Sequence, residues 1–246
     1  KKKPNVIIIM TDDQGYPELS MHGNPILKTP NLDKLGKSSV QFKNFHVTPM
    51  CAPTRGELLT GLDNAVNQLS NVSSGRSLLK SGIPTMGNIF GSNGYSTGIF
   101  GKWGLGAPGS TSEPLKIGFD RFYGYNCQRI AHHYYPYFLW NDTAIEVLWD
   151  NFGMETGSYA PDLIHAQMLD FIDTNSQQPF FCLYAIIQPH AEMFAQEKYM
   201  RKYRGKFLPE SSFNGTDSGP NYRKFAYGSQ PEAHAAFAAM VHCIDD

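Results

Sequence analysis

Residues 5–10 read N-V-I-I-I-M, in which Asn5 is followed by an uninterrupted apolar run of mostly β-branched side chains. A run without alternation of apolar and polar residues is typical of a strand that is buried on both faces of a parallel sheet. Residues 95–100 (Y-S-T-G-I-F) and 180–187 (F-F-C-L-Y-A-I-I) read as further strands. Together these runs predict a mostly parallel sheet.

Helical patterns lie between and after the predicted strands. Residues 161–172 begin with a proline and place apolar side chains at helical spacing, and residues 231–244 do the same. Because strands alternate with helices, the sequence predicts an α/β fold built from βαβ units.

The composition limits the classes of function. The chain has 246 residues, enough to bury a sizeable core, and its formal net charge of −1 gives no basic footprint for nucleic acid. No apolar run is long enough to span a membrane. The four cysteines are widely spaced, which argues against a zinc cluster and leaves room for at most an isolated disulfide. Cys182 lies in a predicted strand and is expected to be a core thiol.

Polar side chains follow the ends of all three predicted strands. Asp12 and Asp13 come after the first, Lys102 after the second and His190 after the third. In open α/β sheets, sites form outside the carboxyl ends of the strands, so we expect these residues to share one site. Taken singly, these residues are better explained as a solvated turn, a surface lysine and a structural histidine.

Residues 51–61 read C-A-P-T-R-G-E-L-L-T-G and predict a helix. Pro53 suits the first helical position, Thr54 and Glu57 fit a capping box, and Gly61 suits the end.

Cys51 would then lie just before the helix N-terminus, where free N–H groups and the helix dipole favour an anion. Arg55 lies about one turn along and can reach back toward that anion. A buried cysteine followed by an ordinary helix is the alternative.

The string C-x-P-x-R-x-x-x-x-T-G at residues 51–61 resembles the signature of type I sulfatases, in which the cysteine is converted to the aldehyde formylglycine. The segments P-N-V-I-I-I-M-T-D-D-Q-G (4–15), G-K-W (101–103) and P-H-A (189–191) also resemble family elements. Hydration of such an aldehyde gives a gem-diol. One hydroxyl can attack sulfur and displace the alcohol, and the second can then lose its proton, expel sulfate and restore the aldehyde.

The resemblance implies a role for each of these residues. Asp12, Asp13 and the converted Cys51 would bind one divalent cation, usually calcium, for which carboxylate oxygens are suitable ligands. Arg55 and Lys102 would act at the sulfate. His190 would contact sulfate or protonate the leaving alcohol.

One position departs from the family pattern, because Gly104 stands where the family usually has a histidine that hydrogen-bonds formylglycine. Residues 125–140 pack aromatic side chains beside histidines and an arginine, which suits either sugar recognition or an aromatic core. His132 in this segment is the candidate to replace the missing histidine or to bind the sugar.

The resemblance also implies an alkaline phosphatase-like sandwich with a mostly parallel central sheet flanked by helices. Residues 1–246 would form the N-terminal portion of the catalytic domain, without its C-terminal strands and subdomain. The expected substrate is a sulfated carbohydrate, the expected partner a formylglycine-generating maturation enzyme, and the expected location periplasmic or secreted. The alternatives are a phosphatase or phosphodiesterase of the same superfamily, and a catalytically impaired sulfatase-like protein that binds glycans.

Overall fold

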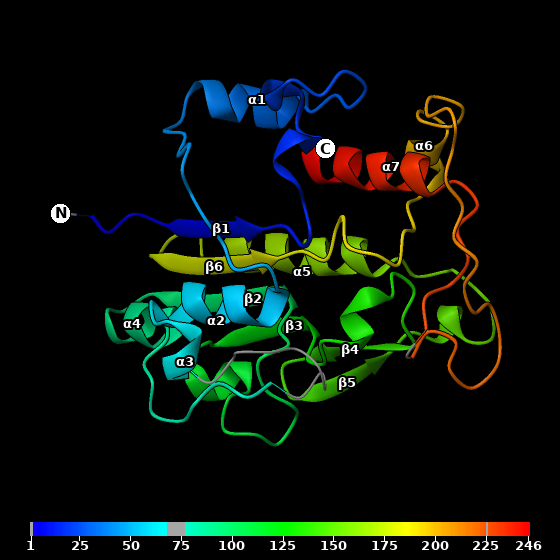
Figure 1. Cartoon of the computed structure of the whole chain (residues 1–246). Helices are drawn as coiled ribbons and strands as arrows, with labels where there is room; N and C mark the ends of the chain where they lie inside the picture. Colours follow the sequence, from blue (N-terminus) through cyan, green and yellow to red (C-terminus); the bar gives the residue numbers. More distant parts are fainter. Residues whose placement is uncertain (1, 68–76, 225) are drawn as a thin grey trace. The chain divides into compact units, whose positions relative to one another are not determined.

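The computed structural model describes residues 2–67, 77–224 and 226–246, which divide into two compact units (Figure 1). Unit 1 comprises Lys1–Met10 and Thr48–Ile187, and unit 2 comprises Thr11–Val47 and Gln188–Asp246. The elements of unit 1 are β1 (Val6–Met10), α2 (Cys51–Thr60), α3 (Asn64–Asn67), α4 (Met86–Ser92), β2 (Ser96–Lys102), β3 (Arg121–Tyr125), β4 (Phe138–Asn141), β5 (Ala144–Val147), α5 (Ala160–Thr174) and β6 (Phe180–Ala185). Those of unit 2 are α1 (Pro30–Lys37), α6 (Glu197–Met200) and α7 (Ala233–Asp245).

All the strands of unit 1 lie in one six-stranded sheet with the order β1-β6-β2-β3-β4-β5. The pairs β1–β6, β6–β2 and β2–β3 are parallel, whereas β3–β4 and β4–β5 are antiparallel. The three strands predicted from the sequence are therefore neighbours in the parallel part. The prediction of a mostly parallel sheet in an α/β fold is confirmed.

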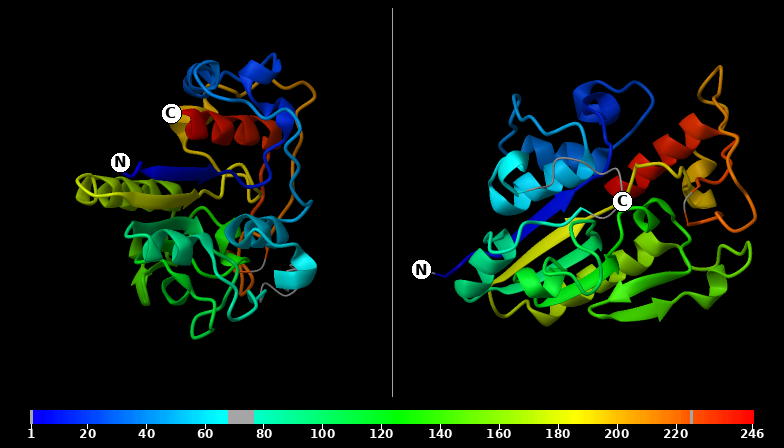
Figure 2. Two further views of the ribbon diagram at one scale, coloured as in Figure 1. Left: turned by 90° about the vertical axis from the view of Figure 1, so that its left-hand side faces the viewer. Right: turned by 60° about the horizontal axis from the view of Figure 1, so that its bottom comes forward.

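Helices cover both faces of this sheet (Figure 2). Phe181 of β6 stacks on Phe90 of α4, with ring centroids 4.3 Å apart. The neighbouring residue Phe180 packs instead on Phe171 of α5, at 6.0 Å. Because successive side chains of a strand point to opposite faces, α4 and α5 lie on opposite sides of the sheet. The core on the α4 side also contains Leu59 of α2.

The expectation that β1 is buried on both faces is wrong. Its edge position leaves Ile7 and Ile9 exposed, by 47% and 60%, while Val6 and Ile8 pack against the core on the α4 side. Since α5 packs over β2, β3 and β6, the second face of β1 has no helix of unit 1 above it among the described residues. An apolar run thus does not by itself distinguish a central strand from an edge strand.

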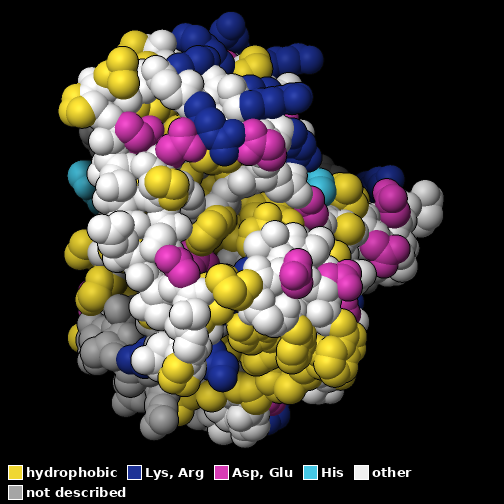
Figure 3. Space-filling model, turned by 90° about the vertical axis from the view of Figure 1, so that its right-hand side faces the viewer, with side chains coloured by type: hydrophobic (Ala, Val, Ile, Leu, Met, Phe, Trp, Pro, Cys, Tyr) yellow, Lys and Arg dark blue, Asp and Glu magenta, His cyan; other side chains and the backbone are white. Residues whose placement is uncertain are grey.

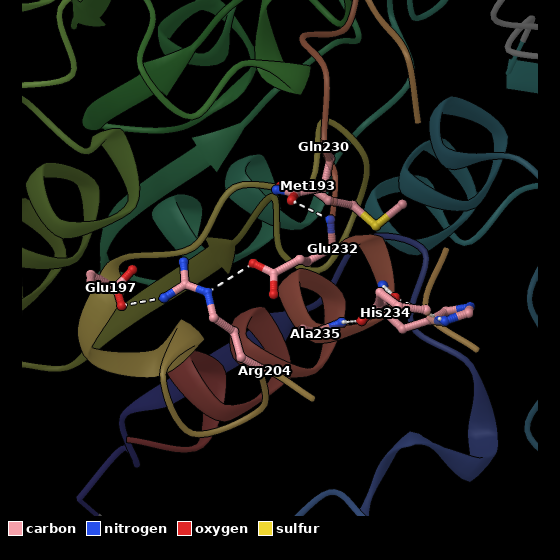
Figure 4. Close-up of polar contacts among 8 residues, drawn as sticks. Met193, Glu197, Arg204, Gln230, Glu232, His234 and Ala235 are labelled. Carbon is pink, nitrogen blue, oxygen red and sulfur yellow. Dashed lines mark hydrogen bonds and ion pairs between the residues drawn. The ribbon is translucent and has the colours of Figure 1, made fainter. Parts of the chain in front are cut away.

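Unit 2 has its own core, formed by α7, α6 and the segment around Leu27. Polar contacts fix the start of α7 (Figure 4). The carboxylate of Glu210 accepts hydrogen bonds from the backbone N–H groups of His234 and Ala235, at 2.9 and 3.2 Å. Arg204 donates to Glu232 at 2.8 Å. Glu210 therefore supplies the N-terminal cap that α7 lacks within its own sequence.

Replacing Glu210 with alanine is expected to lower the free energy of unfolding of unit 2 by about 1 kcal/mol, because first-turn N–H groups of α7 lose their acceptor. Burial raises the pKa of Glu210, but hydrogen bonds from Ser211, His234 and Ala235 outweigh it and leave the pKa below 4.5. The unfolded chain then binds more protons in this range, so the contribution is present above about pH 4.5 and is lost as the pH falls through the folded-state pKa. Amide hydrogen exchange at residues 234 and 235 measures the effect. Glu210→Gln, which keeps one acceptor oxygen, should lose less, and an unchanged exchange rate in Glu210→Ala would contradict this role.

None of the four cysteines, all of which lie in the described part of the chain, forms a disulfide. Cys182 has no exposed surface, and burial raises the pKa of its thiol to about 12, which confirms the expected core thiol. In the part of the chain that the structure describes, no helix combines the length and the apolar character that a membrane crossing requires.

Candidate active site

Helix α2 begins at Cys51, which is half-buried and occupies the first helical position rather than the position before it. The predicted capping box is wrong, because Met50 precedes the helix and the Thr54 hydroxyl faces the carbonyl oxygens of Thr48 and Met50, each at 2.9 Å, either of which can accept its hydrogen. Pro53 consequently lies at the third position. Gly61 ends the helix in the left-handed conformation, as predicted. The first turn of α2 still presents its N-terminus beside residue 51.

Arg55 connects α2 to the end of β2. Its side chain is 4% exposed, and its Nη1 donates to the carbonyl oxygen of Lys102 at 2.9 Å. Lys102 is the last residue of β2. The signature arginine is therefore held at the carboxyl end of a central strand, where the sequence places Lys102.

Lys102 is buried, with 1% of its surface exposed. Its Nζ lies 3.3 Å from Nε2 of His132, a residue of the short 3-10 turn Ile130–His132. A solvated surface lysine, the alternative interpretation of Lys102, is therefore excluded, because the ammonium group is buried beside an imidazole. The basic groups of Arg55, Lys102 and His132 therefore lie in one part of unit 1, where they can favour an anion.

Gln128 is a site neighbour that the sequence did not indicate. Its Nε2 donates a hydrogen bond to Sγ of Cys51, and the side chain is 4% exposed. Gln128 stands in the irregular segment after β3, and no spacing in the sequence relates it to residue 51. The one sequence signal for Gln128 is its place in the aromatic and basic segment at residues 125–140.

Asp12, Asp13 and His190 belong to unit 2. Asp12 is buried, and its backbone N–H donates to the carbonyl of Gln188 at 3.0 Å, which links the two segments that follow β1 and β6. Nε2 of His190 lies 3.2 Å from Oδ2 of Asp13. The residues after these two strand ends thus meet within unit 2, as the parallel β1–β6 pairing predicts. A common site with Cys51 stays a prediction.

The donor atoms of the side chains show whether these residues suit a divalent cation. Asp12 and Asp13 offer carboxylate oxygens, the donor type that calcium prefers, and burial of Asp12 favours a charged partner. Over residues 2–67, 77–224 and 226–246, no group of three or more His, Cys, Asp or Glu side chains forms a metal cluster. The pair therefore fits part of a calcium site and leaves the other ligands unassigned.

The aromatic segment at residues 125–140 contributes mainly to the core. Tyr125 is 2% exposed and its hydroxyl donates to the carbonyl of His133 at 2.7 Å, while Tyr134 is fully buried against Tyr159. Apolar side chains also reach the surface of the molecule (Figure 3). For Tyr125 and Tyr134, the core interpretation is the better one.

Comparisons with known proteins agree with one another. A family model described as Sulfatase matches residues 4–246. The chain is 31% identical over 231 residues to N-acetylgalactosamine-6-sulfatase of Rattus norvegicus, which covers 83% of this chain and 43% of that protein. It is 30% identical over 248 residues to the ulvan-active sulfatase of Formosa agariphila, which covers 96% of this chain and 44% of that protein.

The fold also matches solved structures. The crystal structure of Ps i-CgsB superposes with a TM-score of 0.75 at 26% identity, over 99% of this chain and 53% of that one. The chain spans about half the length of the curated relatives it matches.

Proposed function

Because the chain belongs to the sulfatase family, we propose that the protein hydrolyses sulfate esters of a carbohydrate, with Cys51 converted to formylglycine as its nucleophile. The relatives described as N-acetylgalactosamine-6-sulfatase and ulvan-active sulfatase support a sugar sulfate as the substrate.

The observation that carries this proposal is the arrangement around Cys51 in unit 1. The residue begins α2, whose N-terminal N–H groups favour an anion. Arg55 bonds to the backbone of Lys102, and both side chains are buried beneath the same strand end. A nucleophile formed at position 51 would lie at a helix N-terminus, in the same unit as two cationic groups, which suits a sulfate ester.

Each remaining residue has a proposed part. Formylglycine at position 51 would supply a hydrated aldehyde, and a calcium ion held by Asp12, Asp13 and that residue would supply charge stabilisation. Lys102 binds sulfate oxygens. His190 binds sulfate or gives a proton to the leaving alcohol, and Asp13 orients its ring through the 3.2 Å contact. His132 orients Lys102 or binds the sugar.

The proposal also includes a partner and a location. Conversion of Cys51 would require a formylglycine-generating enzyme or an equivalent. The family resemblance favours a periplasmic or secreted protein, and no helix of the described residues suits a membrane span.

Release of inorganic sulfate, followed by ion chromatography, tests the proposal. The protein is produced in a host that matures sulfatases and incubated with a sulfated galactosamine, with ulvan and with the matching phosphate ester. Sulfate release without phosphate release is the expected result. Phosphate release in preference to sulfate release would favour a phosphatase. Binding of sulfated glycans with no release of either anion would favour the glycan-binding alternative.

A further inference from the structure

We propose that Gln128 is the positioning residue that holds hydrated formylglycine at position 51, in the place that a side chain at position 104 would otherwise take. This inference rests on the proposed conversion of Cys51.

The backbone brings Gln128 to this place. Hydrogen bonds continue the β2–β3 ladder beyond the strand ends, from N–H of Trp103 to the carbonyl of Tyr125 at 2.9 Å and from N–H of Gly104 to that of Asn126 at 3.2 Å. Residues 126–128 therefore run beside residues 103–104. The chain then turns, and the side chain of Gln128 reaches Cys51.

Gly104 and Gln128 occupy complementary positions. Gly104 has φ of +73°, a conformation that residues with a side chain rarely adopt. A Cβ built there would collide with Oε1 of Gln128, so the space next to position 104 is already filled by the amide. A histidine at 104 would be strained and would displace Gln128. Gly104 departs from the family pattern, and the side chain of Gln128 occupies the space that a side chain at position 104 would fill.

When residue 51 is a thiol, only one end of the Gln128 amide is hydrogen-bonded. Nε2 of Gln128 donates to Sγ of Cys51, but Oε1 is buried and has no hydrogen-bond partner among the described residues. A buried acceptor without a donor costs free energy, so native structures rarely leave one. A gem-diol offers two hydroxyls in place of one weak S–H group. One of its oxygens can accept from Nε2 while the other hydroxyl donates to Oε1, which satisfies both ends of the amide.

The chemistry of an amide limits this role to orientation. Gln128 has no ionisable group and cannot take the proton that the second hydroxyl loses. It can hold both hydroxyls in a fixed direction, so that one faces the sulfur and the other stays available for deprotonation. Loss of that orientation should slow the reaction more than it weakens substrate binding.

Steady-state kinetics test the assignment. Gln128→Ala is expected to lower kcat by about 100-fold while changing KM much less. Gln128→Glu is nearly isosteric, so its protonated form keeps the geometry, whereas its ionised form repels sulfate. Its kcat/KM should therefore rise as the pH falls through the pKa of the new carboxyl, a limb that the wild-type enzyme lacks. Gln178→Ala is the matched control, because Gln178 bonds Ser96 at the opposite end of β2, at 2.8 Å, and should leave the kinetics unchanged.

A second readout does not depend on turnover. An aldehyde-reactive hydrazide captures formylglycine only in its dehydrated form, so a hydrate stabilised by Gln128 is captured slowly. Gln128→Ala should be labelled several-fold faster than the wild-type protein and Gln178→Ala at the wild-type rate. If residue 51 is still a thiol, iodoacetamide replaces the hydrazide. Alkylation of Gln128→Ala should then be slower than that of Gln178→Ala, because the thiolate loses the amide donor that stabilises it.

The outcomes separate this inference from the proposed function. A wild-type protein that releases no sulfate would refute the function, and the labelling rates would still decide whether Gln128 holds residue 51. Equal labelling of wild type and Gln128→Ala, or a kcat of Gln128→Ala within about threefold of wild type, would overturn the inference. Melting curves and circular dichroism of each variant show whether it is folded.

Discussion

Cys51→Ala is expected to abolish sulfate release, with kcat reduced by at least about a thousandfold, because the variant cannot form the aldehyde. The position is half-buried at the start of α2, and alanine is compatible with a helix. Folding should therefore be preserved. Cys243→Ala is the matched control, since Cys243 is also a partly buried thiol outside any disulfide but lies on α7 of unit 2, and it should keep full activity.

Cys51→Ser gives a sharper version of the same test. Serine carries one hydroxyl, whose oxygen can attack sulfur while the alcohol leaves with a proton. No second hydroxyl remains to expel the sulfate, so a sulfate ester on the introduced serine should accumulate to one equivalent and be visible by mass spectrometry. Steady turnover by the alanine or serine variant would exclude residue 51 as the nucleophile.

Lys102→Met should lower kcat/KM by about 100- to 1000-fold, because the proposed sulfate site would lose a preorganised cationic donor. Methionine keeps most of the volume of the buried side chain, so the change removes charge with little cavity formation. The loss of sulfate release from a sulfated sugar, measured at several substrate concentrations, gives the effect on kcat and KM separately.

Lys116→Met controls for the loss of a positive charge from unit 1. Lys116 is half-exposed and pairs with Glu113 at 2.8 Å on the surface. This variant should keep wild-type kinetics. Wild-type kinetics in Lys102→Met with an unchanged melting temperature would instead show that Lys102 is a structural residue.

Three of the six strands, β1, β2 and β6, could be predicted because strong apolar runs coincide with them. The resemblance carried by residues 51–61 is confirmed by the family model that matches nearly the whole chain. Ile7 and Ile9 were predicted to be buried and are exposed, since a run of apolar residues does not show which neighbours a strand has. The end of α2 at Gly61 was predictable from local backbone chemistry. The start of α2 was not predictable, because the Thr54 hydroxyl bonds to carbonyl groups of the preceding loop instead of capping the helix.

For the site as well, local sequence patterns predict the position of a residue along its strand but not its contacts with distant segments. Lys102 could be placed at a strand end from its sequence neighbours alone. Its contact with His132 and the contact of Gln128 with Cys51 connect residues 30 and 77 positions apart. Such contacts depend on how the segment after β3 folds back, which local pattern does not encode. The Gly104 departure was visible in the sequence, whereas the residue that fills its space was not.

The mass of the peptide that contains residue 51, from protein made in a host that matures sulfatases, decides whether Cys51 is the precursor of the nucleophile. We expect Cys51 to have lost its sulfur and two hydrogens and gained one oxygen. An intact cysteine at position 51 in protein that nevertheless releases sulfate would show that the nucleophile is not formylglycine.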